Sequence, residues 1–141
     1  SFQTFMTGEQ FDLLSNSSVL RHSVDTDEWD KSAFNEALND SLSRPERLSA
    51  NLFNLRARDL LTAQPKEVAR ARLSGLLVGS ELAAARPFWL GQQVAVVGAT
   101  ALSQIYADAL ASQGVPATVA DGARMTLAGL QAAYRQVKET A

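Results

Sequence analysis

Two segments of this 141-residue sequence combine small residues with predicted helices in a way that suits a nucleotide. In the first, the apolar run Val94–Val97 predicts a buried strand, and Gly98, Ala99 and Thr100 make the turn into a helix capped by Thr100. The start of a helix presents unpaired N–H groups and a partial positive charge, and small residues let a ligand approach the backbone. The turn therefore predicts a nucleotide contact, although a tight strand-to-helix turn in any α/β protein would look the same.

The second segment lies inside a long predicted helix, where Gly75 and Gly79 share one face because they are four residues apart. Glycine in a helix interior costs about 1 kcal/mol relative to alanine, so a pair of glycines needs a reason. One interpretation is that another helix packs closely on this flat strip. The other is that a purine lies near it, with Glu81 bonding a nucleotide ribose or pairing with Arg56.

Thr7 and Glu9 are weaker candidates for a functional site. Thr7 fits the N-cap of a helix, Gln10 completes a capping box, and Met6 and Phe11 occupy the positions of a hydrophobic staple. Glu9 in the first turn is favoured by the helix dipole. Local capping explains these residues without any catalytic role.

The sequence shows no constellation typical of acid–base, nucleophilic or metal chemistry. The acidic cluster Asp25, Asp27, Glu28 and Asp30 lacks the pattern of a divalent-ion loop, so solvated charges or a helix cap are its expected roles. There is no cysteine, and the one histidine, His22, falls in a polar segment where a surface position is expected. We therefore assign neither a catalytic residue nor a metal ligand to this chain.

The composition, with 46% hydrophobic and 20% charged residues, is that of a soluble globular domain. A formal net charge of -2 leaves no basic excess to neutralise phosphates, so nucleic acid is not an expected partner. No apolar run is long enough to cross a bilayer, and no secretory signal is visible. We expect a cytoplasmic protein with no membrane partner.

The elements that must position these segments are mostly helical. The pattern predicts a strand over Phe2–Met6 and then four helices: one over about 7–20, one that ends before Pro45, one that begins after a cap at Ser49 and one over about 65–86. A strand at Val94–Val97 follows, and a helix runs from Thr100 until Gly114 ends it. The chain closes with a strand over Ala117–Ala120 and a last helix capped by Asp121. The last four elements form a β-α-β-α unit, which implies parallel strands with a right-handed crossover. The last helix carries one apolar stripe, formed by Leu127, Leu130, Tyr134 and Val137.

Three short strands make a narrow sheet for so many helices, and the chain opens inside a predicted strand with Ser1. We expect the missing strands upstream of Ser1, so the sequence is interpreted as part of a larger α/β domain. Such a part exposes apolar surface that is normally covered, which predicts self-association, for example as a homodimer.

Four segments in register along the chain resemble the carboxy-terminal half of the 2-dehydro-3-deoxygalactonokinases, also called 2-keto-3-deoxygalactonate kinases: Phe2–Glu9, Leu52–Arg58, Leu73–Glu81 and Val94–Ala101. The resemblance spans essentially the whole chain and implies the actin/hexokinase/Hsp70-like superfamily, in which two ribonuclease-H-like domains hold ATP between them. Residues 1–141 would then be the carboxy-terminal, nucleotide-side domain. It would be a helix-rich α/β domain with a short mixed sheet lacking its first strands, and with a helical insert at about 21–64.

The resemblance also implies an activity, the ATP-dependent phosphorylation of 2-dehydro-3-deoxy-D-galactonate to its 6-phosphate by the intact parent protein. It assigns nucleotide contacts to Gly98, Ala99, Thr100, Gly75, Gly79 and Glu81, and positions near the cleft to Thr7 and Glu9. The phosphate loops, the Mg²⁺-positioning acid and the catalytic base would lie on a missing amino-terminal domain, so this chain should be inactive alone. Two alternatives stay open: a non-catalytic α/β interaction domain of the same topology, or a kinase for another sugar.

Overall fold

The computed structural model describes residues 2–140 and divides the chain into two compact units, Ser1–Pro87 and Phe88–Ala141. Within residues 2–87 the regular elements of the first unit are all helical: α1 (Thr7–Asn16), the 3-10 turn η1 (Val19–His22), α2 (Lys31–Ser43), η2 (Pro45–Arg47), α3 (Leu48–Thr62) and α4 (Lys66–Ala84). A short helix, α5 (Arg86–Trp89), lies at the junction. The second unit consists of β1 (Val94–Gly98), α6 (Thr100–Ser112), β2 (Ala117–Asp121) and α7 (Gly122–Thr140). The helix-rich α/β class predicted from the sequence is confirmed.

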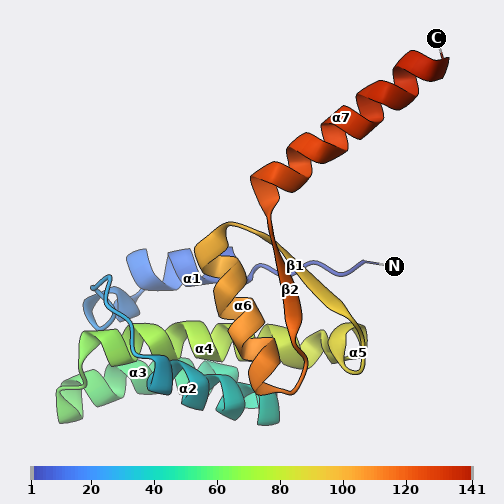
Figure 1. Cartoon of the computed structure of the whole chain (residues 1–141). Coiled ribbons are helices and arrows are strands. Elements are labelled where there is room, and N and C mark those ends of the chain that lie inside the picture. The colour runs from blue at the N-terminus through green and yellow to red at the C-terminus, as the bar shows by residue number, and fades with distance from the viewer. Residues whose placement is uncertain (1, 141) are drawn as a thin grey trace. The chain divides into compact units, whose positions relative to one another are not determined.

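Helix α4 is the centre of the first unit. It contacts α1, α2 and α3, and Figure 1 shows α1 on one side of it and α2 and α3 on the other. The buried core joins apolar side chains from these helices and the loop before α2: Leu20, Val24, Ala37, Leu55, Ala69, Leu73, Leu76 and Leu77. Because α4 is packed on several sides, its sequence is apolar around most of its circumference.

Local sequence signals explain both ends of α2. An Asp30 Oδ1 atom accepts a hydrogen bond of 2.7 Å from the Ala33 backbone N–H, so for Asp30 the helix cap, one of the two roles expected for this acidic cluster, is confirmed. The helix ends at Ser43, two residues before Pro45, because a residue that precedes proline is disfavoured in helical geometry. The segment 21–64 that we predicted as a helical insert thus contains α2, η2 and α3.

Three local predictions for the first unit are wrong. Phe2–Met6 is not a strand: the only described sheet joins β1 to β2, so its alternating pattern has no partner strand in the described chain. Thr7 is the first helical residue rather than the cap, and the N-cap position falls on Met6 without a side-chain bond. Ser49 likewise lies inside α3, which begins at Leu48.

The second unit is built on a parallel pair of strands. β1 and β2 pair from Val94 with Ala117 to Gly98 with Asp121, and α6 connects them and packs on the sheet. Helix α6 ends before Gly114, which adopts the left-handed backbone (φ +78°) that favours glycine, as the sequence predicts. Figure 1 shows α7 continuing from the end of β2 away from this sheet.

Two further expectations need correction in the second unit. The described sheet has two strands rather than three, and β1 is not buried on both faces, because Val97 is 56% exposed. In addition, α6 has Ala99 at its N-cap position, so Thr100 is the first helical residue and not the cap. No helix in the described part of the chain is long and apolar enough to span a bilayer.

Candidate functional site

The turn from β1 into α6 leaves the start of a helix open. Ala99 has an extended backbone (φ -64°, ψ 136°), and no side chain caps the first turn of α6. The first N–H groups of a helix have no partner within the helix, so at this turn they are available to a ligand. The exposed side chain at Ala99 is only a methyl group, which keeps the approach open.

A second strand-to-helix turn lies beside the first. β2 ends at Asp121, α7 begins at Gly122, and the parallel register places Asp121 next to Gly98. The Asp121 carboxylate accepts a hydrogen bond of 2.8 Å from the Arg124 backbone N–H, which confirms the predicted cap of α7. Because carboxyl ends of parallel strands meet at one edge of a sheet, both helices start at the same edge.

The glycines at these two turns lie close to neighbouring atoms. A β-carbon added to Gly122 would lie 3.2 Å from the Gly98 Cα atom and 3.4 Å from its carbonyl carbon and oxygen. A β-carbon added to Gly98 would lie 3.1 Å from the hydroxyl oxygen of the buried Ser103. A side chain added at Gly122 would therefore press against backbone atoms, and one added at Gly98 would press against a buried side chain.

An open pocket of about 720 Å³ lies between the two turns. Its lining comes from β1, the two turns and the first residues of α7: Val97, Gly98, Ala99, Asp121, Gly122, Ala123, Met125 and Thr126. Backbone groups of the turns offer hydrogen bonds, while Val97 and the 46%-exposed Met125 offer apolar surface. Such a pocket suits a flat heteroaromatic ring with polar edges, which is the chemistry of a purine.

Only the first half of this pocket is predicted from the sequence. Gly98 and Ala99 are expected ligand contacts, whereas Asp121, Gly122, Met125 and Thr126 have no predicted ligand role. A signal was present, since the predicted β-α-β-α order already implied a second strand-to-helix turn at the same edge of the sheet. Thr100 follows the first turn but does not line the pocket.

The structure confirms the packing interpretation of Gly75 and Gly79. Both are buried, and both face α2. A β-carbon on Gly79 would lie 2.6 Å from the Leu38 carbonyl oxygen, and one on Gly75 would contact the Phe34 carbonyl oxygen. Since α2 fills the strip, the glycines serve to let α2 and α4 approach closely. A nucleotide contact for Gly75, Gly79 and Glu81 stays a prediction.

Arg56 pairs within its own helix. Its guanidinium lies 2.6 Å from an Asp59 carboxylate oxygen, and the fully buried Ser23 hydroxyl donates a bond of 2.7 Å to the same oxygen. The Ser23 hydrogen bond and the Arg56 charge hold the pKa of Asp59 below its ordinary value of 3.8, although burial opposes the shift. Thr7 and Glu9 occupy the first turn of α1, where Glu9 is exposed.

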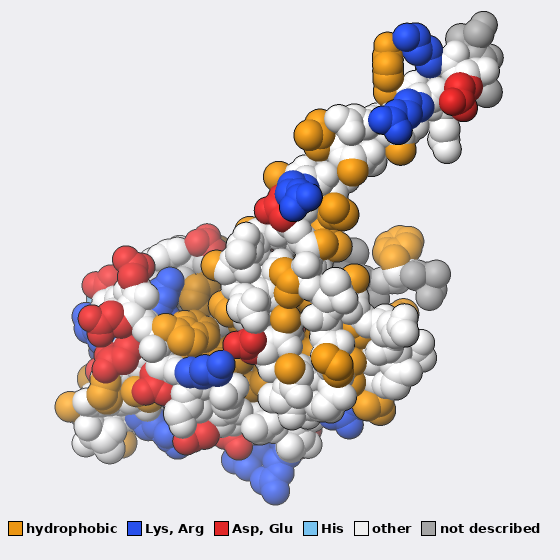
Figure 2. All heavy atoms as spheres, in the orientation of Figure 1, with side chains coloured by type: hydrophobic (Ala, Val, Ile, Leu, Met, Phe, Trp, Pro, Cys, Tyr) orange, Lys and Arg blue, Asp and Glu red, His pale blue; other side chains and the backbone are white. Residues whose placement is uncertain are grey.

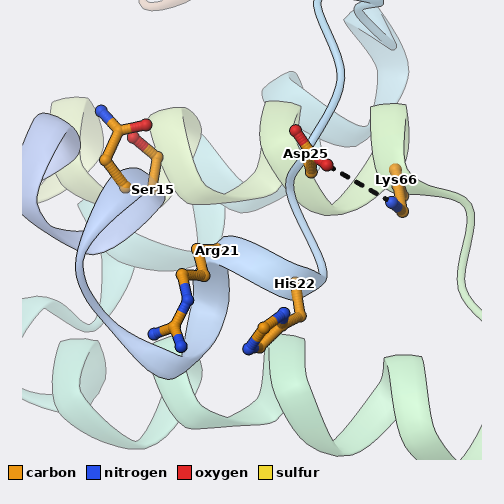
Figure 3. Close-up of a pocket in the computed structure, with 6 residues that line it drawn as sticks. Ser15, Arg21, His22, Asp25 and Lys66 are labelled. Atoms are coloured by element: carbon orange, nitrogen blue, oxygen red, sulfur yellow. Dashed lines mark ion pairs between the residues drawn. The ribbon is translucent and has the colours of Figure 1, made fainter.

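His22 lies at the surface, as the sequence predicts, in an open polar depression of about 340 Å³. Figure 3 shows Arg21 and His22 pointing away from Ser15, while Asp25 forms a 3.9 Å ion pair with Lys66. The polar side chains therefore do not converge on one point. Among residues 2–140, no three histidine, cysteine or acidic side chains gather as a metal site would require.

Comparison with known proteins decides the family. The sequence profile of the 2-keto-3-deoxy-galactonokinase family matches residues 1–133. This chain belongs to that family. The strand-to-helix turns and the pocket between them are therefore features of a 2-keto-3-deoxy-galactonokinase chain, as the resemblance of the four sequence segments implied.

Individual relatives agree with this assignment. The chain is 37% identical to a Rhizobium meliloti (strain 1021) protein named 2-dehydro-3-deoxygalactonokinase DgoK1 over 140 residues, which cover 96% of this chain and 46% of the relative. It is 34% identical to the Escherichia coli (strain K12) 2-dehydro-3-deoxygalactonokinase, covering 92% of this chain and 44% of that protein. The chain thus spans about half the length of the curated relatives it matches.

A solved structure supports the fold. A Sinorhizobium meliloti crystal structure that carries the name 2-dehydro-3-deoxygalactonokinase superposes with a TM-score of 0.91 at 36% sequence identity. The match covers 97% of this chain and 47% of that chain. Almost every element described above therefore has a counterpart in a relative about twice as long.

Proposed function

We propose that this chain supplies the adenosine-binding half of an ATP-dependent sugar-acid kinase. The observation that carries the proposal is the pocket between the β1–α6 and β2–α7 turns, in a chain of the 2-keto-3-deoxy-galactonokinase family. The open start of α6 supplies hydrogen-bond donors to the nucleotide, and Val97 and Met125 supply apolar contact to the ring.

The names of the relatives support the following reaction for the whole polypeptide. The terminal hydroxyl of 2-dehydro-3-deoxy-D-galactonate attacks the γ-phosphorus of ATP, giving the 6-phosphate, ADP and a proton. Phosphoryl transfer depends on groups that position both substrates and neutralise charge together. On this chain the role is to bind and orient adenosine. The Mg²⁺ that usually accompanies ATP is expected to be held mainly by the other half, because no acidic side chains of the described residues are grouped so that they could hold a metal ion.

The test is a titration of the ¹⁵N-labelled 141-residue chain with AMP and ATP, followed by NMR. We expect the Gly98 and Gly122 amides to shift at millimolar nucleotide, because both lie at the pocket. No shift at Gly98 or Gly122 would contradict the proposal and favour a non-catalytic interaction domain.

Kinase activity is tested separately. We expect no phosphorylation of the keto-deoxy acid by this chain alone, and phosphorylation when the chain is joined to the missing half of the family's polypeptide. Activity of the joined protein toward another sugar, with none toward this acid, would overturn the substrate and leave the nucleotide pocket in place.

A further inference from the structure

Helix α7 carries an apolar stripe with no described element packed along it. Leu127, Leu130 and Tyr134 follow the three- and four-residue spacing of one helix face, and they are 58%, 64% and 64% exposed. Among the described elements, α7 packs mainly on β1 and β2. Figure 2 shows hydrophobic side chains along this helix beyond the sheet.

A helix with such a stripe is normally held in place by what it packs against. Isolated helices of this length are marginal in water, and most helical stability in proteins comes from burial of an apolar face. Exposed contiguous apolar surface of this kind marks an interaction site more often than a solvated face. We therefore expect another protein surface to pack on this stripe.

We infer that the stripe Leu127–Leu130–Tyr134 docks onto the half of the family's polypeptide that this sequence lacks. The inference rests on the proposed function, in which two halves complete one kinase. Its support is the length of the relatives: the crystal-structure relative matches 97% of this chain, while more than half of its own length lies outside the match. A substantial part of the relative is therefore available to cover a face left open here.

The position of α7 supports the same occupant. Its first turn, with Ala123, Met125 and Thr126, lines the candidate nucleotide pocket, so whatever covers the stripe lies beside that pocket. A cleft between two halves would place the second half there. The stripe and the pocket would then be neighbouring parts of one interface.

A second copy of this chain is a weaker occupant on grounds of area. A stable interface between separate chains buries about 800 Å² on each partner, far more than three partly exposed side chains offer. A covalently joined half needs less area, because its effective concentration is high.

The experiment compares two variants of α7 in two contexts. Leu130→Glu places a charge in the stripe, and the matched control Ala132→Glu places the same charge on the opposite, exposed face. Each is made in the 141-residue chain and in a fusion of this chain with the unmatched half of the Sinorhizobium meliloti relative, joined in the order of the relative. Thermal unfolding and molar mass in solution are measured for all of them.

We expect Leu130→Glu to lower the melting temperature of the fusion by several degrees and to leave that of the isolated chain unchanged, because the stripe is buried only in the fusion. Ala132→Glu should change neither. Equal melting temperatures for the two fusion variants would overturn the inference, as would a wild-type fusion that does not unfold cooperatively. Loss of a homodimer of the isolated chain on Leu130→Glu would also overturn it, in favour of a second copy.

Failure of this inference is distinguishable from failure of the nucleotide proposal. The AMP titration of the isolated chain reports on Gly98 and Gly122 and does not need the stripe. A fusion that loses stability with Leu130→Glu, together with a chain that gives no nucleotide shifts, would uphold the interface and reject the pocket.

Discussion

Asp59 is held by a small polar network in the first unit. The buried Ser23 hydroxyl and the Arg56 guanidinium both bond its carboxylate, at 2.7 Å and 2.6 Å, and they hold its pKa below 3.8. A carboxyl group whose pKa is lowered in the folded state stabilises the fold above its unfolded pKa. That contribution is lost as the pH falls through the lower, folded pKa.

We therefore predict that Asp59→Asn lowers the melting temperature at pH 7, because the charge that Arg56 and Ser23 bond is removed. The difference from the wild type should shrink toward zero as the pH falls through the lowered pKa of Asp59, where the wild-type carboxylate becomes protonated too. Thermal unfolding from pH 2 to 7 measures this. The exposed loop variant Asp27→Asn serves as the control, and a pH-independent deficit of Asp59→Asn would contradict the electrostatic account.

Ala99 is the residue at which the nucleotide pocket can be filled without disturbing a helix. It is exposed, its backbone is extended, and it lines the pocket beside Gly98. We predict that Ala99→Phe weakens AMP binding by about tenfold or more, because the added ring occupies part of the pocket; tenfold corresponds to about 1.4 kcal/mol of binding free energy. Ala111→Phe, on an exposed site near the other end of α6, is the matched control for the added ring. Equal affinities of the two variants would place the nucleotide elsewhere.

At the scale of elements, the contact between α2 and α4 holds the first unit together. The two glycines on α4 bring it against the backbone of α2, and the buried Ser41 hydroxyl donates a bond of 2.7 Å across the contact to the Leu76 carbonyl oxygen. Close approach compensates for the unfavourable helix propensity of glycine in this position.

Gly79→Ala should therefore destabilise the protein although alanine is the better helix former. The new methyl group would lie 2.6 Å from the Leu38 carbonyl oxygen and 2.9 Å from the Ser41 β-carbon, so the helices must separate. Overpacking of this kind costs about 1–3 kcal/mol. The free energy of unfolding in urea measures the loss, and Gly8→Ala in α1, with nothing within 4 Å, is the control that should lose nothing. A Gly79→Ala protein as stable as the wild type would refute close packing as the reason for this glycine.

Elements whose signal is local were predicted well. The strands Val94–Gly98 and Ala117–Asp121 follow from short apolar runs that end in turn residues, and the end of α2 follows from Pro45. The caps at Asp30 and Asp121 were predicted correctly, but those at Thr7, Ser49 and Thr100 were not, because a cap depends on the backbone angles of the residue before the helix. Thr7 and Thr100 were predicted as caps that precede their helices, but each is the first residue of its helix.

Features that depend on distant partners could not be read from the sequence. The alternation of Phe2–Met6 is a strand signal, but a strand forms only beside another strand, and no described strand pairs with it. The glycine strip was compatible with a helix or a purine, and only the position of Leu38 decides in favour of the helix. The second half of the pocket, at Gly122, depends on the pairing of β1 with β2, which places two turns at one edge.

At the scale of the whole molecule, the pocket and the stripe of α7 are joined by one helix. Met125 and Thr126 line the pocket, and Leu127 and Leu130 follow directly along the same element. If the missing half docks on the stripe, it fixes α7 and completes the surroundings of the nucleotide. The docked half and AMP would then both favour the same position of α7. Each must strengthen the binding of the other by the same factor.

We predict, on this basis, that Leu130→Glu weakens AMP binding by about fivefold or more in the fused two-half protein, since coupling between sites is commonly at least that large. In the isolated 141-residue chain the same substitution should leave AMP affinity unchanged, because the residue does not line the pocket. Titration of both proteins with AMP measures the two affinities, and Ala132→Glu controls for the added charge. An equal loss in both contexts would mean that the charge acts directly on the pocket, and α7 would then not transmit any effect of the second half.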